Sequence, residues 1–175
     1  MKWKPKIIEP SLCRIYIAAL FDDLQRYFDV RQELESRLGK IDYNTESMDS
    51  DVLPSLYSNI SRRHVRFLSF ERPSGREEIV DLKKKTIAIE TKFQSEGRPQ
   101  VELDLGYVTE FSVVKSSLED GFHRIYLYGG VFAETLYTYE NYRFEPVRGV
   151  PAFYSRKEVV TVFNDLRHIL CAVQK

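Results

Sequence analysis

Apolar and polar residues follow two periods along the chain, and these periods predict strands and helices in a fixed order. A continuous apolar run at 14–21 ends at Asp22 and Asp23, which is typical of a buried strand that leads into a helix. Apolar residues at helical spacing over 24–38, followed by Gly39, predict that helix and its C-terminal end. The first two elements are therefore a strand and a helix.

Residues 40–105 are predicted to repeat this alternation. Residues 40–49 look extended, residues 50–63 are expected to form a loop, and the apolar run at 65–70 predicts a strand. Apolar residues alternate with Glu and Asp over 101–105, which is the pattern of a half-buried strand. A helix is predicted between these last two strands.

This second helix is marked at both of its ends. Ser74 and Glu77 have the spacing of a capping box at its start, its apolar stripe begins at Ile79, and Gly97 is expected to end it. The order of elements is then β-α-β-β-α-β, which is the connectivity of a ferredoxin-like sandwich.

A glycine pair gives the clearest local signal in the C-terminal part of the chain. Gly129 and Gly130 separate strand-like runs at 123–128 and 131–139, which predicts an antiparallel hairpin with a two-residue turn. A further turn leads into a short strand at 143–145.

A C-terminal helix is the last predicted element. Ser155 and Glu158 form a capping-box pair before an apolar stripe that runs from Val159 to Val173. The predicted fold class is α+β: a ferredoxin-like β-α-β-β-α-β sandwich extended by the antiparallel hairpin and this helix. No repeat or linker divides residues 1–175, so a single domain is expected, with a loose N-terminal segment at 1–12.

Charge and cysteine content narrow the classes of partner. The 26 basic and 26 acidic residues cancel, so the net basic field of a nucleic-acid binder is absent, and near-zero net charge favours a homo-oligomer. No apolar run reaches the roughly 18 residues of a membrane span. Cys13 and Cys171 lie far apart without metal-type spacing, and no secretion signal precedes them, so a cytoplasmic location is expected.

The common cofactor motifs are absent from the sequence. Gly39 and Lys40 are the one Gly-Lys pair, but Leu34 and Ile41 stand where a phosphate-binding loop needs Gly and Ser or Thr. No dinucleotide fingerprint, zinc-protease motif, Cys-x-x-Cys pair or nucleophile elbow occurs. The sequence therefore predicts no metal site and leaves any cofactor unknown.

The hairpin predicts one polar pair on an apolar face. With Gly129 and Gly130 in the turn, Ile125 opposes Glu134 and His123 opposes Leu136, so His123 and Glu134 lie diagonally, roughly 7–8 Å apart between Cα atoms. A carboxylate and an imidazole on such a face need partners, and general acid–base pairs are built in this way. The alternative is a satisfied structural pair, and a register slip of one residue would separate the two groups.

Several short strings together resemble a known family. They are Arg66-Phe-Leu-Ser-Phe-Glu71, Leu103-Asp-Leu-Gly-Tyr107, His123-Arg-Ile-Tyr-Leu127, Ala133-Glu134, Tyr139 and Phe163…Arg167. From Arg14 to Arg167 the chain resembles the uncharacterised bacterial and archaeal domain-of-unknown-function family 4416. The resemblance implies no established activity, substrate or cofactor. It implies a recurring polar pattern of Asp104, Gly106, Tyr107, His123, Arg124 and Glu134.

The chain resembles a divergent member of that family. Glu102-Leu-Asp-Leu-Gly-Tyr107 stands where the family has Asn-Leu-Asp-Pro-Gly-Tyr, and Glu119 stands where the family has a lysine. If the missing polar groups served a shared site, this chain carries a modified version of it.

The first functional hypothesis is a site for a small polar or anionic ligand near His123 and Glu134. His123, Glu134 and Asp104 are the candidate catalytic residues, and Tyr107 and Arg124 are the candidate ligand-binding residues. In the predicted register Arg124 points away from His123, so the set converges only if a bulge intervenes. The sequence does not decide whether the chain is an enzyme.

Two alternatives remain open. One is a non-catalytic protein-interaction module or homo-oligomer that uses a tyrosine-rich sheet face, formed by Tyr126, Tyr128, Tyr137, Tyr139 and Tyr142. The other is weak single-stranded RNA binding through the basic cluster Arg62, Arg63, His64 and Arg66 with Phe67 and Phe70. Because the net charge is zero, RNA binding is the least favoured of the three hypotheses.

Overall fold

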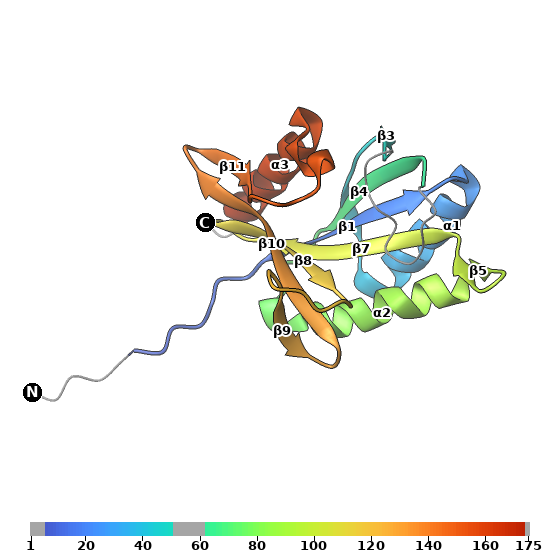
Figure 1. Cartoon of the computed structure of the whole chain (residues 1–175), viewed down its shortest axis with the longest axis horizontal. Coiled ribbons are helices and arrows are strands. Elements are labelled where there is room, and N and C mark those ends of the chain that lie inside the picture. Colours follow the sequence, from blue (N-terminus) through green and yellow to red (C-terminus); the bar gives the residue numbers. More distant parts are fainter. Residues whose placement is uncertain (1–5, 51–61, 174–175) are drawn as a thin grey trace, which may run out of the picture.

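The computed structural model describes residues 6–50 and 62–173, so most of the predicted loop at 50–63 lies outside the described residues. The α+β fold class is confirmed, because an antiparallel sheet is packed against α-helices (Figure 1). The helices are α1 (Leu24–Leu38), α2 (Ile79–Lys92) and α3 (Lys157–Val173), with 3₁₀ turns η1 (Arg76–Glu78) and η2 (Ala152–Ser155).

The main sheet is antiparallel throughout and runs in the order β11-β10-β8-β7-β1-β4-β2, with β3 added beside β4 and β9 beside β10. Strands β5 and β6 form a separate small hairpin. The bounds of the strands are β1 (Arg14–Phe21), β2 (Ile41–Asn44), β3 (Met48–Asp49), β4 (His64–Phe70), β5 (Gln94–Ser95), β6 (Arg98–Pro99), β7 (Val101–Val108), β8 (Ser112–Ser117), β9 (Ile125–Tyr128), β10 (Val131–Glu140) and β11 (Arg143–Pro146).

Both faces of the sheet are covered. Figure 1 shows α1 and α2 on one side of it and α3 on the other. Strand β1 lies between β7 and β4, and all eight of its residues are buried. Its side chains alternate between the two cores, with Ile15 and Ile17 on the α1–α2 side and Tyr16 and Ala18 on the α3 side. This double burial explains why the segment reads as an unbroken apolar run.

The ends of α1 are those predicted from the sequence. The Asp23 carboxylate accepts hydrogen bonds from the backbone N–H groups of Gln25 and Arg26, at 2.8 and 3.2 Å. Gly39 follows the helix with φ of 110°, in the left-handed region that favours glycine.

The predicted ends of α2 are wrong by a few residues. Glu78, not Glu77, reaches back to a backbone N–H, that of Gly75 at 2.9 Å. Ser74 instead forms an isolated antiparallel bridge with Cys13. The helix ends at Lys92, and Gly97, with φ of 75°, lies in the turn between β5 and β6. Strands β5 and β6 pair with each other, so α2 does not continue to Gly97 as the sequence pattern predicts.

Strand β8 was not among the predicted elements, although it joins the two halves of the sheet. Its inner residues Val113 and Val114 are buried, and it pairs with β7 on one side and β10 on the other. The hairpin at the C-terminal end is therefore a continuation of the main sheet. Helix α3 also differs from its predicted start, since the Arg156 carbonyl, and not Ser155, receives the first helical N–H groups.

The predicted register of the β9–β10 hairpin is wrong beyond the turn. Tyr128 opposes Val131 as expected, but the pairing then shifts, so that Tyr126 opposes Phe132 and Ile125 opposes Ala133. A bulge inserts one extra residue on β9 and turns Leu127 against the α1–α2 core. Leu127 is half-buried against that core, and its packing stabilises the shifted register.

Within the described parts of the chain, no helix combines the length and apolarity needed to cross a membrane.

Candidate functional site

Glu134 lies on β10 and is the centre of a three-residue charge cluster. Its side chain is 8% exposed, so its charge requires partners. One carboxylate oxygen, Oε1, lies 3.3 Å from His123 Nε2. The other oxygen, Oε2, accepts a hydrogen bond from Arg124 Nε at 3.2 Å. Both oxygens of the buried carboxylate are therefore engaged, and we call Glu134, His123 and Arg124 the Glu134 cluster.

A turn before β9, and not the strand itself, brings His123 and Arg124 to the same carboxylate. The Arg124 N–H donates to the Gly121 carbonyl at 2.9 Å, which closes the turn. Strand alternation does not apply within a turn, so the predicted separation of Arg124 from His123 is wrong. The sequence argument required a bulge for these side chains to converge, and the structure has one in the adjoining hairpin.

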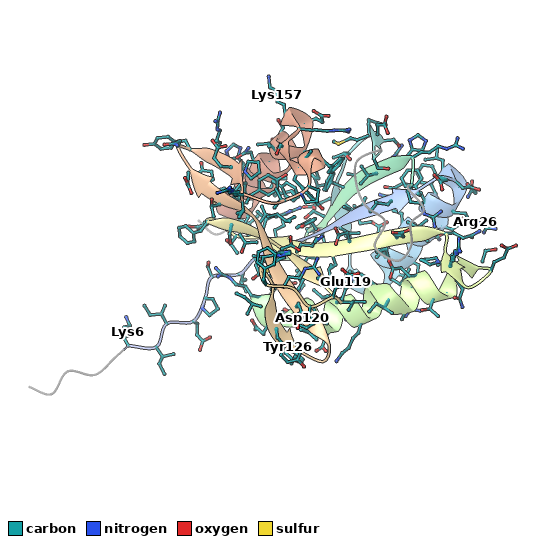
Figure 2. All side chains as sticks on the ribbon, viewed as in Figure 1. Lys6, Arg26, Glu119, Asp120, Tyr126 and Lys157 are labelled. Atoms are coloured by element: carbon teal, nitrogen blue, oxygen red, sulfur yellow. The ribbon has the colours of Figure 1, made fainter. Side chains whose placement is uncertain are left out.

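Arg124 also fixes the loop that precedes the turn. Its Nη1 atom donates to the Glu119 carbonyl at 2.9 Å and lies 3.3 Å from a Glu119 carboxylate oxygen. Figure 2 shows Glu119 and Asp120 beside the β9–β10 hairpin, with Tyr126 nearer its end. Glu119 therefore holds Arg124 through both its backbone carbonyl and its carboxylate.

His123 is the accessible member of the Glu134 cluster. Its side chain is 44% exposed, and the Phe122 ring packs edge-on against it with ring centres 4.9 Å apart. When Nε2 donates to Glu134, the ring orientation is fixed and Nδ1 is left as the acceptor. A carboxylate that orients an imidazole in this way is one arrangement from which general bases are built.

Asp104 does not join this cluster. It lies on β7 with a 5% exposed side chain, where Oδ2 accepts from the Tyr154 hydroxyl at 3.3 Å and lies 3.8 Å from Lys115 Nζ. Within residues 6–50 and 62–173, its other oxygen Oδ1 and the buried Tyr16 hydroxyl have no hydrogen-bond partner. We call Asp104, Lys115, Tyr154 and Tyr16 the Asp104 cluster.

The tyrosines of the Asp104 cluster remain protonated. Burial raises the pKa of Tyr16 and of Tyr154 well above the ordinary tyrosine value, and the Asp104 carboxylate raises both pKa values further. Tyr16 also lies against Gly106, where an added Cβ would come within 2.3 Å of the Val114 carbonyl oxygen and 2.5 Å of the Tyr16 ring. Only glycine fits at this close approach.

Lys115 and Tyr154 were missed by the sequence analysis. Lys115 lies on β8, directly opposite Glu134 on β10, and its ammonium points to Asp104. The adjacent valines Val113 and Val114 were the available signal for that strand, since β-branched residues favour strands. Tyr154 lies in a 3₁₀ turn that no local sequence pattern predicts.

A pocket of about 510 Å³ lies beside the Glu134 cluster, within the range typical of small-molecule sites. Its walls are mainly apolar and come from β7, β8, the β9–β10 hairpin and the segment that follows β11. The lining residues are Tyr107, Val114, Phe122, His123, Ile125, Leu127, Ala133, Glu134, Thr135, Val147, Arg148, Gly149 and Val150.

The predicted site residues thus fall into two groups. The pocket is lined by His123, Glu134 and Tyr107. Arg124 lies outside the pocket lining and holds the Glu134 carboxylate, whereas Asp104 lies in the other cluster. Burial raises the pKa of the Tyr107 hydroxyl, an effect that the Arg76 guanidinium partly offsets. Tyr107 therefore lines the pocket as a neutral side chain.

The residues of the two alternative hypotheses are placed differently from what the sequence suggested. Tyr137 is fully buried and donates to the Tyr154 carbonyl at 2.7 Å, so it is not part of a surface face. Tyr126 and Tyr128 remain exposed on β9. In the basic cluster, Arg62 is paired with Asp22 and Glu102, and the Arg66 guanidinium lies 5.0 Å from the centre of the Tyr27 ring.

Two further features concern metals and thiols. In the described residues, no three His, Cys, Asp or Glu side chains gather closely enough to hold a metal ion. Cys13 and Cys171 are free cysteines, and burial raises the pKa of the Cys13 thiol to about 12. Cys13 is therefore not a thiolate nucleophile in the folded chain.

No curated protein and no solved structure matches this chain. A family model does match, and it covers residues 11–169, which confirms the resemblance found in the strings around Asp104, His123 and Glu134. The chain therefore belongs to the family described as Domain of unknown function (DUF4416).

Proposed function

We propose that the chain binds a small polar or anionic ligand in the pocket beside His123 and Glu134. The observation that carries this proposal is a half-exposed imidazole at the wall of an otherwise mainly apolar pocket, held there by a buried carboxylate. Binding sites for small molecules combine apolar walls with a few fixed polar groups in this way.

The members of the Glu134 cluster have different roles in this proposal. Glu134 already accepts from Arg124 and faces His123, so it orients His123 and does not contact the ligand with a free oxygen. His123 and the neutral Tyr107 hydroxyl supply the polar contacts. If the ligand carries an acidic proton near Nδ1, the same histidine acts as a general base.

We also propose a ferredoxin-like core as the scaffold of the pocket. Four neighbouring strands, β7-β1-β4-β2, carry the two helices α1 and α2 on one face and alternate in direction. That order supports the ferredoxin-like arrangement. Strands β8 to β11 extend it, and the pocket lies within this extension.

Nuclear magnetic resonance titration of the labelled chain with benzoate, benzamide and benzylamine tests ligand binding. We expect at least one of the three to shift amide signals of the pocket residues. Thr135→Trp places a large side chain at an exposed position of the pocket wall and should abolish these shifts. Glu140→Trp is the matched control, because Glu140 is exposed on the same strand outside the pocket.

The proposal fails if none of the three compounds shifts the pocket signals, or if Thr135→Trp leaves the shifts unchanged. A folded Thr135→Trp variant is recognised by retained dispersion of its remaining amide signals.

A second candidate function is self-association through β9. Ile125, Tyr126 and Tyr128 are exposed on this strand, which pairs only with β10 among the described strands. Exposed strand edges with apolar side chains favour pairing with another chain. A light-scattering mass that stays monomeric at high concentration would remove this candidate.

A further inference from the structure

We infer that the ligand of this pocket is a monocarboxylate with an apolar body, and that Arg148 anchors its carboxylate. The inference rests on the proposed function and adds the chemical class of the ligand. It follows from which charges at the pocket already have partners and which one does not.

The negative charge at the pocket is already balanced. Glu134 is the one acidic residue among the lining side chains, and its carboxylate is held by the Arg124 guanidinium from outside the pocket. A cationic ligand would have to compete with Arg124 for oxygens that are already engaged. The site therefore offers no free carboxylate to a cation.

The positive charge at the pocket is not balanced. Arg148 lines the pocket from the segment after β11 and is exposed. In the described part of the chain, Arg148 has no ion pair with a carboxylate. Its turn is shaped by Gly149, with φ of 96°, and by a hydrogen bond from the Val150 N–H to the Val147 carbonyl at 3.3 Å. A guanidinium without a partner at a pocket wall is a carboxylate-binding group.

Charge balance favours one negative charge on the ligand over two. Arg124 is already shared between Glu134 and Glu119, whereas Arg148 lines the pocket without an ion pair among the described residues, so one ligand carboxylate balances its charge. A phosphate monoester would add a second negative charge next to the buried Glu134 carboxylate, in a site with mainly apolar walls. The neutral Tyr107 hydroxyl can donate to the carboxylate or to another acceptor on the ligand.

The pocket walls define the rest of the ligand. Phe122, Ile125 and Leu127 on one side, and Val147 and Val150 on the segment after β11, give the pocket its apolar surface. Contact with this surface stabilises an aromatic ring or a short alkyl chain because apolar area leaves water. Benzoate has this combination of one carboxylate and one apolar ring, and it serves as the model ligand.

Calorimetric or magnetic resonance titration of the full chain with benzoate, benzamide and phenyl phosphate tests the inference. We expect benzoate to bind more tightly than its neutral isostere benzamide and than phenyl phosphate. Arg148→Gln should weaken benzoate binding by about 10-fold or more, as expected for loss of a charged hydrogen bond. Benzamide binding should be unchanged by the same substitution.

Two variants control for general charge effects and for folding. Arg143→Gln removes an exposed arginine that lies outside the pocket and should leave benzoate binding unchanged. Arg148→Lys keeps the charge but lacks the planar fork, so it should bind benzoate with intermediate affinity. Arg148 lies on an exposed turn, and unchanged thermal unfolding of both Arg148 variants would show that they fold.

The possible failures are distinguishable. If benzamide binds as tightly as benzoate and Arg148→Gln has no effect, the carboxylate inference is overturned while the pocket itself stands, provided that Thr135→Trp abolishes benzamide binding. Tighter binding of phenyl phosphate than of benzoate would likewise overturn it. If no compound of either set binds, the proposed function fails together with the inference.

Discussion

Two buried carboxylates, Glu134 and Asp104, lie on the same sheet in clusters of different character. Glu134 is engaged through both oxygens, by Arg124 and His123 from a turn at the edge of a pocket. Asp104 is engaged through one oxygen, and its neighbours Tyr16 and Tyr154 are each 1% exposed. A buried carboxylate alone therefore does not identify a ligand site; a solvent-accessible side chain must lie beside it.

Lys115 links the two clusters. Its ammonium is the cation next to Asp104, and its backbone lies opposite Glu134 in the β8–β10 pair. Because directly opposed residues of an antiparallel pair project from the same face, the two carboxylates share that face of the sheet. Apart from Lys115, the Asp104 cluster is buried inside the protein, whereas the Glu134 cluster has an accessible member, His123. Substitutions in each of the two clusters test this difference.

The largest expected effect is a loss of stability at alkaline pH, centred on the Asp104 cluster. Burial raises the pKa of Tyr16, Tyr154 and Tyr137, so above about pH 10 the unfolded chain releases these protons and the folded chain keeps them. The contribution of these three tyrosines to stability is therefore unchanged below that pH and falls as pH rises. For three tyrosines the loss is about 4 kcal/mol by roughly pH 11. Urea unfolding across this range measures it.

The buried hydroxyl of Tyr16 supplies a control for that titration. Tyr16→Phe should reduce the alkaline loss by about 1.4 kcal/mol at pH 11, since one of the titrating groups is removed. Tyr142→Phe, at a tyrosine with 94% exposure, should leave the loss unchanged. Equal pH slopes for Tyr16→Phe and the unsubstituted chain would contradict the assignment.

The next largest effect is expected for Lys115→Met. Removal of the ammonium leaves the Asp104 carboxylate buried without a cation, which costs about 3 kcal/mol of unfolding free energy. Adding Asp104→Asn should recover part of that loss, because the uncompensated charge is gone. Lys84→Met is the matched control: the Lys84–Asp81 pair is exposed, so about 0.5 kcal/mol or less is expected. Additive losses in the double variant would refute coupling between Lys115 and Asp104.

The smallest effects are expected in the Glu134 cluster. Glu134→Gln weakens the hold on Arg124 and should cost about 1–2 kcal/mol, since the turn can open and hydrate the guanidinium. His123→Ala should change stability by no more than about 0.5 kcal/mol, because the ring is nearly half exposed. Both variants should lose ligand binding measured by titration with benzoate. A loss of several kcal/mol for His123→Ala would instead identify a purely structural pair.

Sequence patterns predicted the elements whose signals are local. Asp23 and Gly39 mark the ends of α1 by capping chemistry that depends on neighbouring backbone groups alone. The turn at Gly129 and Gly130 was predicted for the same reason, because both glycines take positive φ. Strand β8 was missed because its two valines are a weak local signal and its other four residues become a strand by pairing with β7 and β10.

For the candidate site, the sequence predicted the partners of one contact and misplaced the geometry of the rest. It paired His123 with Glu134, and the two side chains meet at 3.3 Å. It separated Arg124 from them unless a bulge intervened, and in the structure a turn beside a bulged hairpin brings Arg124 to Glu134; Asp104 instead contacts Tyr154. Lys115 and Tyr154 could not be found, because residues 104, 115 and 154 come together only across three separate elements.

What the sequence determined by itself is the α+β class, the main helices and strands, and the family to which the chain belongs. These follow from apolar periodicity, capping residues and glycine turns, which act over a few neighbouring residues. Tertiary structure alone decided that the hairpin carries a bulge at Leu127, and that His123 and Arg124 converge on Glu134. The reason is physical: register and burial depend on all the surfaces that pack together, and no short segment contains that information.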